Sequence, residues 1–166
     1  GGLFSGVGGI ELGFEKAGFN VIWANEIDEN SCITYRNNFT HNLIEGDIKN
    51  IRGKDLKPVN VLCGGFPCQP FSIAGYQRGF EDDRGNIFFE IIRIINELKS
   101  KPDVLFLENV KNFRSHDKGK TFKTVIDIIQ QNGYSVFYDV LNTSDYTKIP
   151  QNRERTFLIC FKDEFG

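Results

Sequence analysis

Short apolar segments alternate with amphipathic helical segments along the whole chain. After a first strand ending at Phe4, the pattern predicts strands at Val21–Ala24, Leu43–Glu45, Val59–Leu62, Val104–Leu107, Val136–Leu141 and Thr156–Phe161. Helices are expected at Ile10–Ala17, Glu29–Asn38, Asn86–Lys99 and Thr121–Gln131. This alternation is typical of βαβ units. We therefore expect an α/β fold with a doubly wound, mostly parallel sheet, covered on both faces, whose ligands bind at the carboxyl ends of the strands.

The size and composition of the chain indicate one globular domain spanning residues 1–166. Of these residues, 40% are hydrophobic and 25% are charged, which is enough apolar material for a substantial core. The sequence has neither an apolar run of about 18 residues nor a charged-then-apolar leader, so we expect no membrane span and a cytoplasmic location. It contains no methionine and opens at Gly1 as though inside a strand, so we expect its native start to lie upstream.

The cysteines and histidines do not have metal-site spacing. Cys32, Cys63, Cys68 and Cys160 form no C-x-x-C pair, and the two histidines lie far from them in sequence, so no metal is expected. The net charge of −2 is low for a protein that grips nucleic acid alone, because phosphate neutralisation supplies much of such affinity. If the substrate is nucleic acid, part of the grip lies elsewhere.

A glycine loop and two acids predict an adenosine site. The loop Phe4–Gly9 lies between a strand and a helix, but Glu11 stands where a dinucleotide fingerprint needs glycine or alanine, which argues against NAD. Glu26 closes the second strand, where a carboxylate binds ribose hydroxyls. Asp47 follows the third strand, placed to accept from an adenine amine while Ile48 packs on the purine. The alternative is that both acids are helix-start or turn residues.

An exposed thiol and a carboxyl group are expected at the same edge of the sheet, where the parallel strands end. In GGFPCQPFS, two prolines and two glycines fix a turn that places Cys68 after the strand Val59–Leu62, whereas the other three cysteines read as small buried hydrophobes. Glu108 ends the next strand, so the pair suggests covalent catalysis with acid assistance.

Gln151, Arg153 and Arg155 alternate at strand spacing and so face one side. They either clamp an anion or form an exposed strand face. The long loop from Cys68 to Gly85 is typical of a binding lid.

The motifs LFSGVGG, NEID, GDI, GGFPCQPFS, ENV and QNRER occur in an order and spacing that resemble the bacterial cytosine carbon-5 DNA methyltransferases. The resemblance covers essentially the whole chain. GFPCQPFS and ENV are highly specific to that family, whereas GDI and the glycine loop alone are weak. The stretch from Ser72 to Phe89 looks like the family's mobile catalytic loop.

The resemblance implies a role for each matching residue. Cys68 corresponds to the nucleophile that adds to carbon 6 of cytosine, Glu108 to the acid at ring nitrogen 3, and Arg155 to the residue that contacts the base and orients that acid. Arg153 would lie near the nucleophile. The implied cofactor is S-adenosylmethionine, and its contacts would be Phe4, Val7, Gly9, Glu26, Ile27, Asp47, Ile48, Gly65, Pro67 and Ile87. The substrate would be double-stranded DNA with the target base flipped out.

Two features depart from the family pattern. Ile27 stands where many relatives have an aromatic residue against the adenine, which implies weaker stacking. In the family, a target-recognition region and a final returning segment follow QNRER, and the sequence stops at Gly166 before either. The chain is therefore expected to be a fragment of a longer restriction-modification enzyme, a subunit completed by a partner, or a truncated remnant. RNA cytosine methylation and a non-catalytic regulatory module are the alternative functions.

Overall fold

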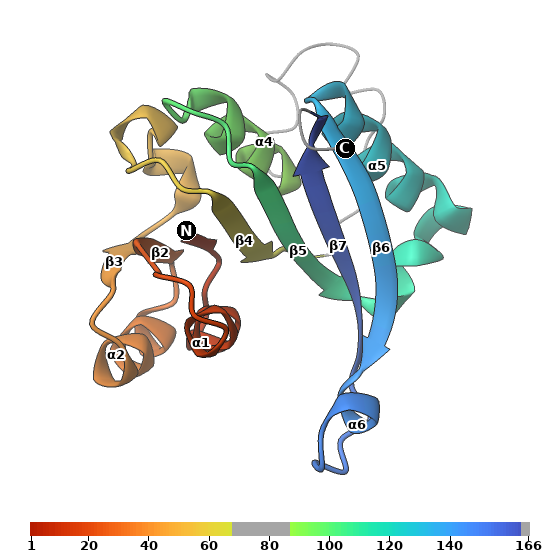
Figure 1. Cartoon of the computed structure of the whole chain (residues 1–166), viewed down its shortest axis with the longest axis horizontal. Helices are drawn as coiled ribbons and strands as arrows, with labels where there is room; N and C mark the ends of the chain where they lie inside the picture. The colour runs from red at the N-terminus through yellow and green to blue at the C-terminus, as the bar shows by residue number, and fades with distance from the viewer. Residues whose placement is uncertain (68–86, 164–166) are drawn as a thin grey trace.

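The structure, a computed structural model, describes residues 1–67 and 87–163. Its seven strands form one sheet in the order β3-β2-β1-β4-β5-β7-β6 (Figure 1). The strands are β1 (Gly2–Leu3), β2 (Trp23–Glu26), β3 (Asn42–Glu45), β4 (Val61–Gly65), β5 (Val104–Val110), β6 (Tyr134–Asn142) and β7 (Glu154–Lys162). Strands β1 to β5 are parallel, while β7 runs antiparallel to both β5 and β6. The predicted mostly parallel α/β sheet is confirmed.

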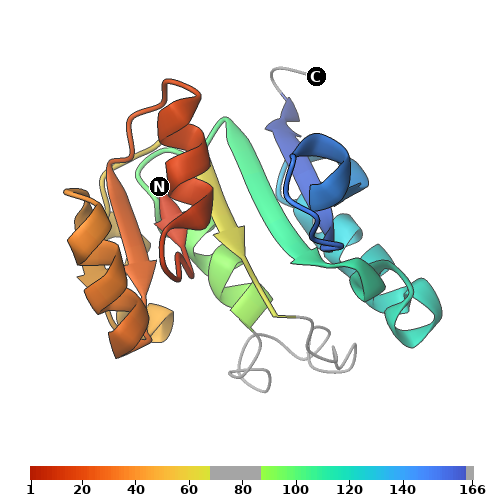
Figure 2. The same cartoon turned by 90° about the horizontal axis from the view of Figure 1, so that it is seen from below.

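Helices cover both faces of the sheet, as expected. Helices α1 and α2 lie on one face, and α4 and α5 lie on the other (Figure 2). Their bounds are α1 (Gly9–Lys16), α2 (Glu29–Asn38), α4 (Ile87–Glu97) and α5 (Lys120–Gln131), with a short α6 (Thr143–Tyr146) between β6 and β7. Within the described ranges, no helix is long and apolar enough to cross a bilayer.

Four 3₁₀ turns complete the described chain. They are η1 (Ile48–Asn50), η2 (Gly53–Asp55), η3 (Lys111–Arg114) and η4 (His116–Gly119). Turns η1 and η3 come directly after the ends of β3 and β5, so both belong to the edge of the sheet where the parallel strands end. The sequence pattern did not predict these turns because they are too short to show a periodicity.

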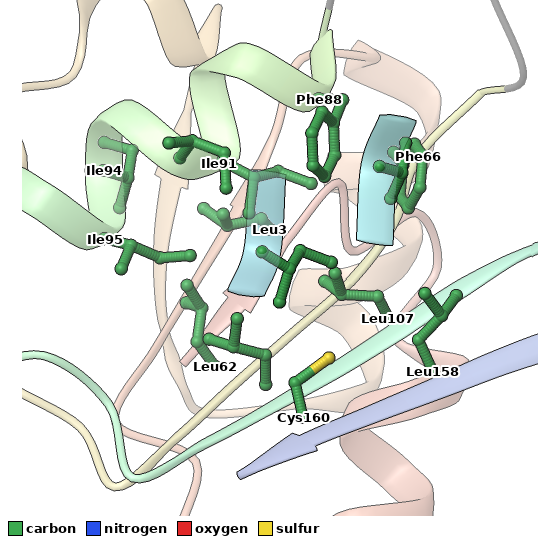
Figure 3. Packing of buried hydrophobic residues seen from close by; sticks show 14 of the residues in the cluster. Leu3, Leu62, Phe66, Phe88, Ile91, Ile94, Ile95, Leu107, Leu158 and Cys160 are labelled. Atoms are coloured by element: carbon green, nitrogen blue, oxygen red, sulfur yellow. The ribbon is translucent and has the colours of Figure 1, made fainter. Parts of the chain in front are cut away.

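The main core lies between α4 and the middle of the sheet. Phe88, Ile91 and Ile95 of α4 are completely buried and face Leu62 and Leu107 from the strands beneath them (Figure 3). Burying a side chain of this size stabilises a fold by about 1.5–3 kcal/mol. The predicted apolar face of this helix is confirmed, and it fixes the positions of β4 and β5, whose ends form the site described below.

One half of the opposite face has no helix over it in the described parts of the chain. Phe106 of β5, Phe157, Ile159 and Phe161 of β7, and Phe137 of β6 line this area, which we call the open sheet face. Phe137 is 61% exposed, and Ile159 and Phe161 are also exposed. Phe14 of α1 touches only its border, with its ring 5.3 Å from that of Phe106. Contiguous exposed apolar surface of this kind is typical of an interaction site.

Candidate active site

The ends of β4 and β5 form the centre of the candidate site. Glu108 lies opposite Gly65 in the parallel register, and the Phe66 amide donates to the Glu108 carbonyl at 3.2 Å. A Cβ at position 65 would lie 3.2 Å from Glu108 Oε2, so glycine there leaves room for the carboxyl group. The predicted nucleophile, Cys68, lies outside the described residues, as do the loop that follows it and its contacts. The chain reaches it two residues after Phe66.

Two arginines approach the carboxyl group of Glu108. Arg155 Nε lies 2.8 Å from Glu108 Oε1, and Arg153 Nη2 lies 4.0 Å from the same oxygen. Arg155 and Glu108 are mostly buried, whereas the Arg153 side chain is 51% exposed. The second oxygen, Oε2, has no hydrogen-bond partner among the described residues and faces the space beside Gly65. Among the described residues, the carboxyl group is thus held through Oε1 alone.

Gln151, Arg153 and Arg155 were expected to face one side at strand spacing; the two arginines do approach the same carboxyl group, but Gln151 and Arg153 lie before the strand. Strand β7 begins at Glu154, so only Arg155 lies within it. The side chain of Asn142 accepts from the Arg153 amide at 2.9 Å and takes the place of a strand partner. Arg153 nevertheless reaches the carboxyl group of Glu108, so both arginines belong to this site.

A buried asparagine that the sequence analysis left without a role holds the ends of β4 and β5 together. Asn109 is 1% exposed, and its Nδ2 donates to the carbonyl of Phe66 at 2.9 Å. Its Oδ1 accepts from the amide of Val110 at 2.8 Å. The sequence feature that could have identified Asn109 was its position next to Glu108 in the ENV motif. Its contacts fix the residue that immediately precedes the Pro67-Cys68 pair.

The glycine loop after β1 forms the second part of the site. Phe4 has a φ of 55°, which is rare for a side chain of this size and occurs mainly where surrounding structure enforces it. Gly8 has a φ of 91°, and a Cβ there would lie 2.2 Å from the ring of Phe39. By contrast, a Cβ at Gly6 or Gly9 would meet no described atom within 4 Å apart from the adjoining backbone, so the described residues leave space beside the loop. Val7, another predicted contact, is exposed.

Glu26 ties this loop to the end of β2. Its Oε2 accepts from the Gly6 amide at 2.6 Å, and its Oε1 accepts from the amides of Ile27 and Asp28, both at 2.8 Å. A carboxylate has about four acceptor sites, so Glu26 keeps capacity for about one further donor. The residue expected to bind ribose hydroxyls therefore also shapes the loop beside them.

The third part of the site follows β3. Asp47 begins η1, and its Oδ1 accepts from the Lys49 amide at 3.0 Å. Ile48 is 2% exposed and belongs to the core, whereas Ile27 is 64% exposed. Ile27, rather than Ile48, therefore offers apolar surface to a ring placed here. Asn25, which the sequence analysis did not single out, holds this turn by donating to the carbonyls of Ile44 and Gly46, both at 2.9 Å.

All the described site residues lie along one edge of the sheet. The predicted cofactor contacts come from the ends of β1, β2, β3 and β4, and the described residues predicted to be catalytic come from β5 and from the start of β7. Pro67 is exposed at the end of β4, and Ile87 is half-buried at the start of α4. Since β4 lies between β1 and β5, the two groups adjoin at Gly65.

The described cysteines do not offer an alternative nucleophile. Cys32, Cys63 and Cys160 are buried free thiols. Burial raises the pKa of Cys63 and of Cys160 to about 12, and it also raises the pKa of Cys32. Their predicted role as small core residues is confirmed. Among the described residues, no cluster of His, Cys, Asp and Glu has a metal-binding arrangement.

The motifs along this edge agree with a known protein family. The family model described as C-5 cytosine-specific DNA methylase matches residues 2–166. The chain belongs to this family. It is 52% identical over 163 residues to the type II methyltransferase M.Bsp6I of Bacillus sp. (strain RFL6), covering 97% of this chain and 51% of that protein. It is 46% identical over 164 residues to the type II methyltransferase M.HhaI of Haemophilus parahaemolyticus, covering 99% and 49%.

Solved structures of methylases agree with the fold. A putative DNA modification methyltransferase of an Escherichia coli prophage is 26% identical, with a TM-score of 0.78, over 99% of this chain and 46% of that one. The Dnmt2 methyltransferase of S. pombe shares the fold at 20% identity, with a TM-score of 0.73, over 97% and 48%. The chain thus spans about half the length of the relatives that it matches.

Proposed function

We propose that this chain is the catalytic and cofactor-binding part of a DNA (cytosine-5)-methyltransferase of a restriction-modification system. The observation that supports this most strongly is the carboxyl group of Glu108, held by Arg155 through one oxygen at the edge from which the chain continues into Pro67-Cys68. The family match and the type II methyltransferase that is 52% identical to this chain support the same activity. The proposed reaction transfers a methyl group to carbon 5 of cytosine.

The described residues fit S-adenosylmethionine as methyl donor. The ends of β1 to β4 offer open space beside Gly6 and Gly9, the exposed side chain of Ile27 and unused acceptor capacity on Glu26. Ribose hydroxyls need such an acceptor, and an adenine ring needs such an apolar surface. No basic side chain stands in the glycine loop, as suits a ligand without phosphates. When bound, the cofactor supplies an electrophilic methyl group.

In the proposed mechanism, the thiolate of Cys68 adds to carbon 6 of a flipped-out cytosine and makes carbon 5 nucleophilic. Glu108 acts as an acid and donates a proton to ring nitrogen 3 through the oxygen not held by Arg155, which offsets the negative charge that thiolate addition places on the ring. Arg155 keeps that carboxyl group oriented, and Arg153 adds positive charge nearby. After methyl transfer, loss of the carbon-5 proton and elimination of Cys68 restore the aromatic ring.

We infer that the remaining half of the protein, either the downstream chain or a complementary subunit, covers the open sheet face. The apolar side chains there need a partner surface, and the relatives have about as many residues again as this chain. The face continues at Phe14 into a cavity of about 410 Å³ beside α1, lined by Phe14, Phe19, Glu11 and Val59 among others. This docking would also supply the target recognition that the described residues do not provide.

The proposal is tested by methyl transfer from labelled S-adenosylmethionine to unmethylated duplex DNA, with the chain joined to its downstream polypeptide. Cys68→Ser should lower turnover by about 10³-fold or more, because the hydroxyl is a far weaker nucleophile. Glu108→Gln should lower kcat by roughly 10²- to 10⁴-fold with little change in DNA affinity. Cys160→Ala, which removes a buried thiol far from this edge, is the matched control. Normal turnover by Cys68→Ser would refute the mechanism. Methyl transfer to RNA but not to DNA would show that RNA, rather than DNA, is the substrate.

A further inference from the structure

The chain has a strongly basic segment that the proposed mechanism does not use. Residues 111–123 contain five Lys or Arg side chains and a single acid, Asp117, although the whole chain has a net charge of −2. The rest of the chain is therefore clearly acidic. The segment comprises η3, η4 and the first turn of α5, and it carries a local net charge of +4 from its five basic residues and one acid.

This segment lies at the edge of the sheet that holds the candidate active site. It begins directly after β5, three residues beyond Glu108, at the end where parallel β4 and β5 finish (Figure 2). Phe113 anchors it and is completely buried. The Phe113 ring lies 5.6 Å from the ring of Phe66, near the end of β4, and 5.4 Å from that of Phe122 in α5. The segment therefore has a fixed position relative to the residues that precede Cys68.

Three of the five basic side chains are available to a ligand. Two are already paired: Lys111 binds Glu154 at 2.6 Å, and Lys123 binds Asp127 at 2.6 Å. The other three, Arg114, Lys118 and Lys120, have no acidic partner among the described residues, and all are exposed. We call these three residues the basic surface.

Arg114 is oriented by an aromatic contact rather than by an acid. Its guanidinium carbon lies 5.2 Å from the centre of the Tyr138 ring. A guanidinium stacked on a ring keeps the N–H groups at its edge free, and these can bind an anion bidentately. The stacking also restricts the side chain before any ligand arrives, which lowers the entropic cost of binding.

We propose that the basic surface binds backbone phosphates of the DNA duplex that flank the base entering the active site. This inference rests on the proposed function, because a duplex whose base reaches Glu108 must run past this edge. Phosphate contacts by Lys and Arg supply affinity and register without reading sequence. The basic surface therefore contributes equally to target and non-target DNA, and sequence recognition belongs to the other half of the protein.

The test uses the complete protein, in which this chain is joined to its downstream half. The variant Arg114→Gln/Lys118→Gln/Lys120→Gln removes three positive charges from exposed positions. Its Kd is measured for duplexes with and without a methylation target over a series of salt concentrations. Each lost phosphate contact lowers the slope of log affinity against log salt by about 0.9, so three contacts lower it by about 2.7. Affinity should fall by the same factor for both duplexes, while kcat at saturating DNA is retained.

The matched control is Lys16→Gln/Lys57→Gln/Lys99→Gln. It makes the same change in net charge with exposed lysines at the opposite edge, where α1 and α4 end and β4 begins. The control should keep the wild-type slope. An unchanged slope in the basic-surface variant, or an equal loss in the control, would overturn the proposal while leaving methyl transfer intact. If the unsubstituted protein neither binds nor methylates DNA, the proposed function fails first. If the triple variant does not fold, the three single substitutions are measured instead, and each should lower the slope of log affinity against log salt by about 0.9.

Discussion

Gly8 of the glycine loop should tolerate no side chain, and the structure gives the cost. In Gly8→Ala, an L residue would adopt the left-handed conformation at φ 91°, which costs about 1–2 kcal/mol. The new methyl group would lie 2.2 Å from Phe39 Cε2. The Phe39 ring cannot easily move, because it packs against Tyr35 at 4.7 Å and stacks on His41 at 5.0 Å. Overpacking of this kind costs about 1–3 kcal/mol more.

We therefore expect Gly8→Ala to lower the free energy of unfolding by about 2–5 kcal/mol in total. Urea denaturation of the complete protein without cofactor measures this loss. Gly133→Ala is the control, because Gly133 has a similar φ of 87° and its nearest atom to a Cβ would be 3.9 Å away. It should lose only the backbone contribution. Relative to Phe39→Ala alone, the double variant Gly8→Ala/Phe39→Ala should lose only the backbone contribution, because the clash with the ring is gone. Equal losses for the two glycine variants would refute the steric reasoning.

Two further variants probe buried acids. Burial raises the pKa of Glu11 above its usual 4.5, so the folded protein retains a proton that the unfolded chain releases, and stability falls as pH rises above that value. The free energy of unfolding of Glu11→Gln, measured by urea denaturation, should therefore rise relative to that of the wild type as pH increases. A difference that does not change with pH would contradict this. Glu26→Gln keeps one acceptor oxygen and replaces the other with an NH2 group, which cannot accept, so either the Gly6 amide or the Ile27 and Asp28 amides lose their acceptor. Binding of S-adenosylhomocysteine, measured by calorimetry, should weaken by roughly 10- to 100-fold, and an unchanged Kd would remove the role of Glu26.

Within the part of the chain that the structure describes, the sequence predicted each strand and each long helix, but it misplaced some of their ends. Strand β2 was expected at Val21–Ala24 and lies at Trp23–Glu26. Hydropathy favoured the apolar residues Val21 and Ile22, whereas pairing with β3 begins at Trp23 and extends over the polar Asn25 and Glu26. These two polar residues are buried because their side chains bond backbone groups of neighbouring loops. No local pattern shows such partners.

Strand β5 shows the same limit. It was expected to end at Leu107 and continues to Val110, because β7 pairs with Glu108, Asn109 and Val110 from far along the sequence. The membership of the candidate site was easier to predict than its geometry, since the motifs predicted that Glu108 and Arg155 belong to one site. Their 2.8 Å contact, the role of Asn109 and the burial of Ile48 all depend on tertiary packing.

The position of β7 has a consequence for the way the protein is made. Strand β7 is the last of the described strands in sequence, yet it lies between β5 and β6, which are both synthesised earlier. During translation Glu108 therefore emerges well before Arg155, whose side chain contacts it, and β5 and β6 cannot take their final places until β7 inserts between them. A nascent chain that stops before residue 154 has Glu108 without Arg155. Synthesis of β7 is therefore the step that brings Arg155 to Glu108 in the proposed catalytic site.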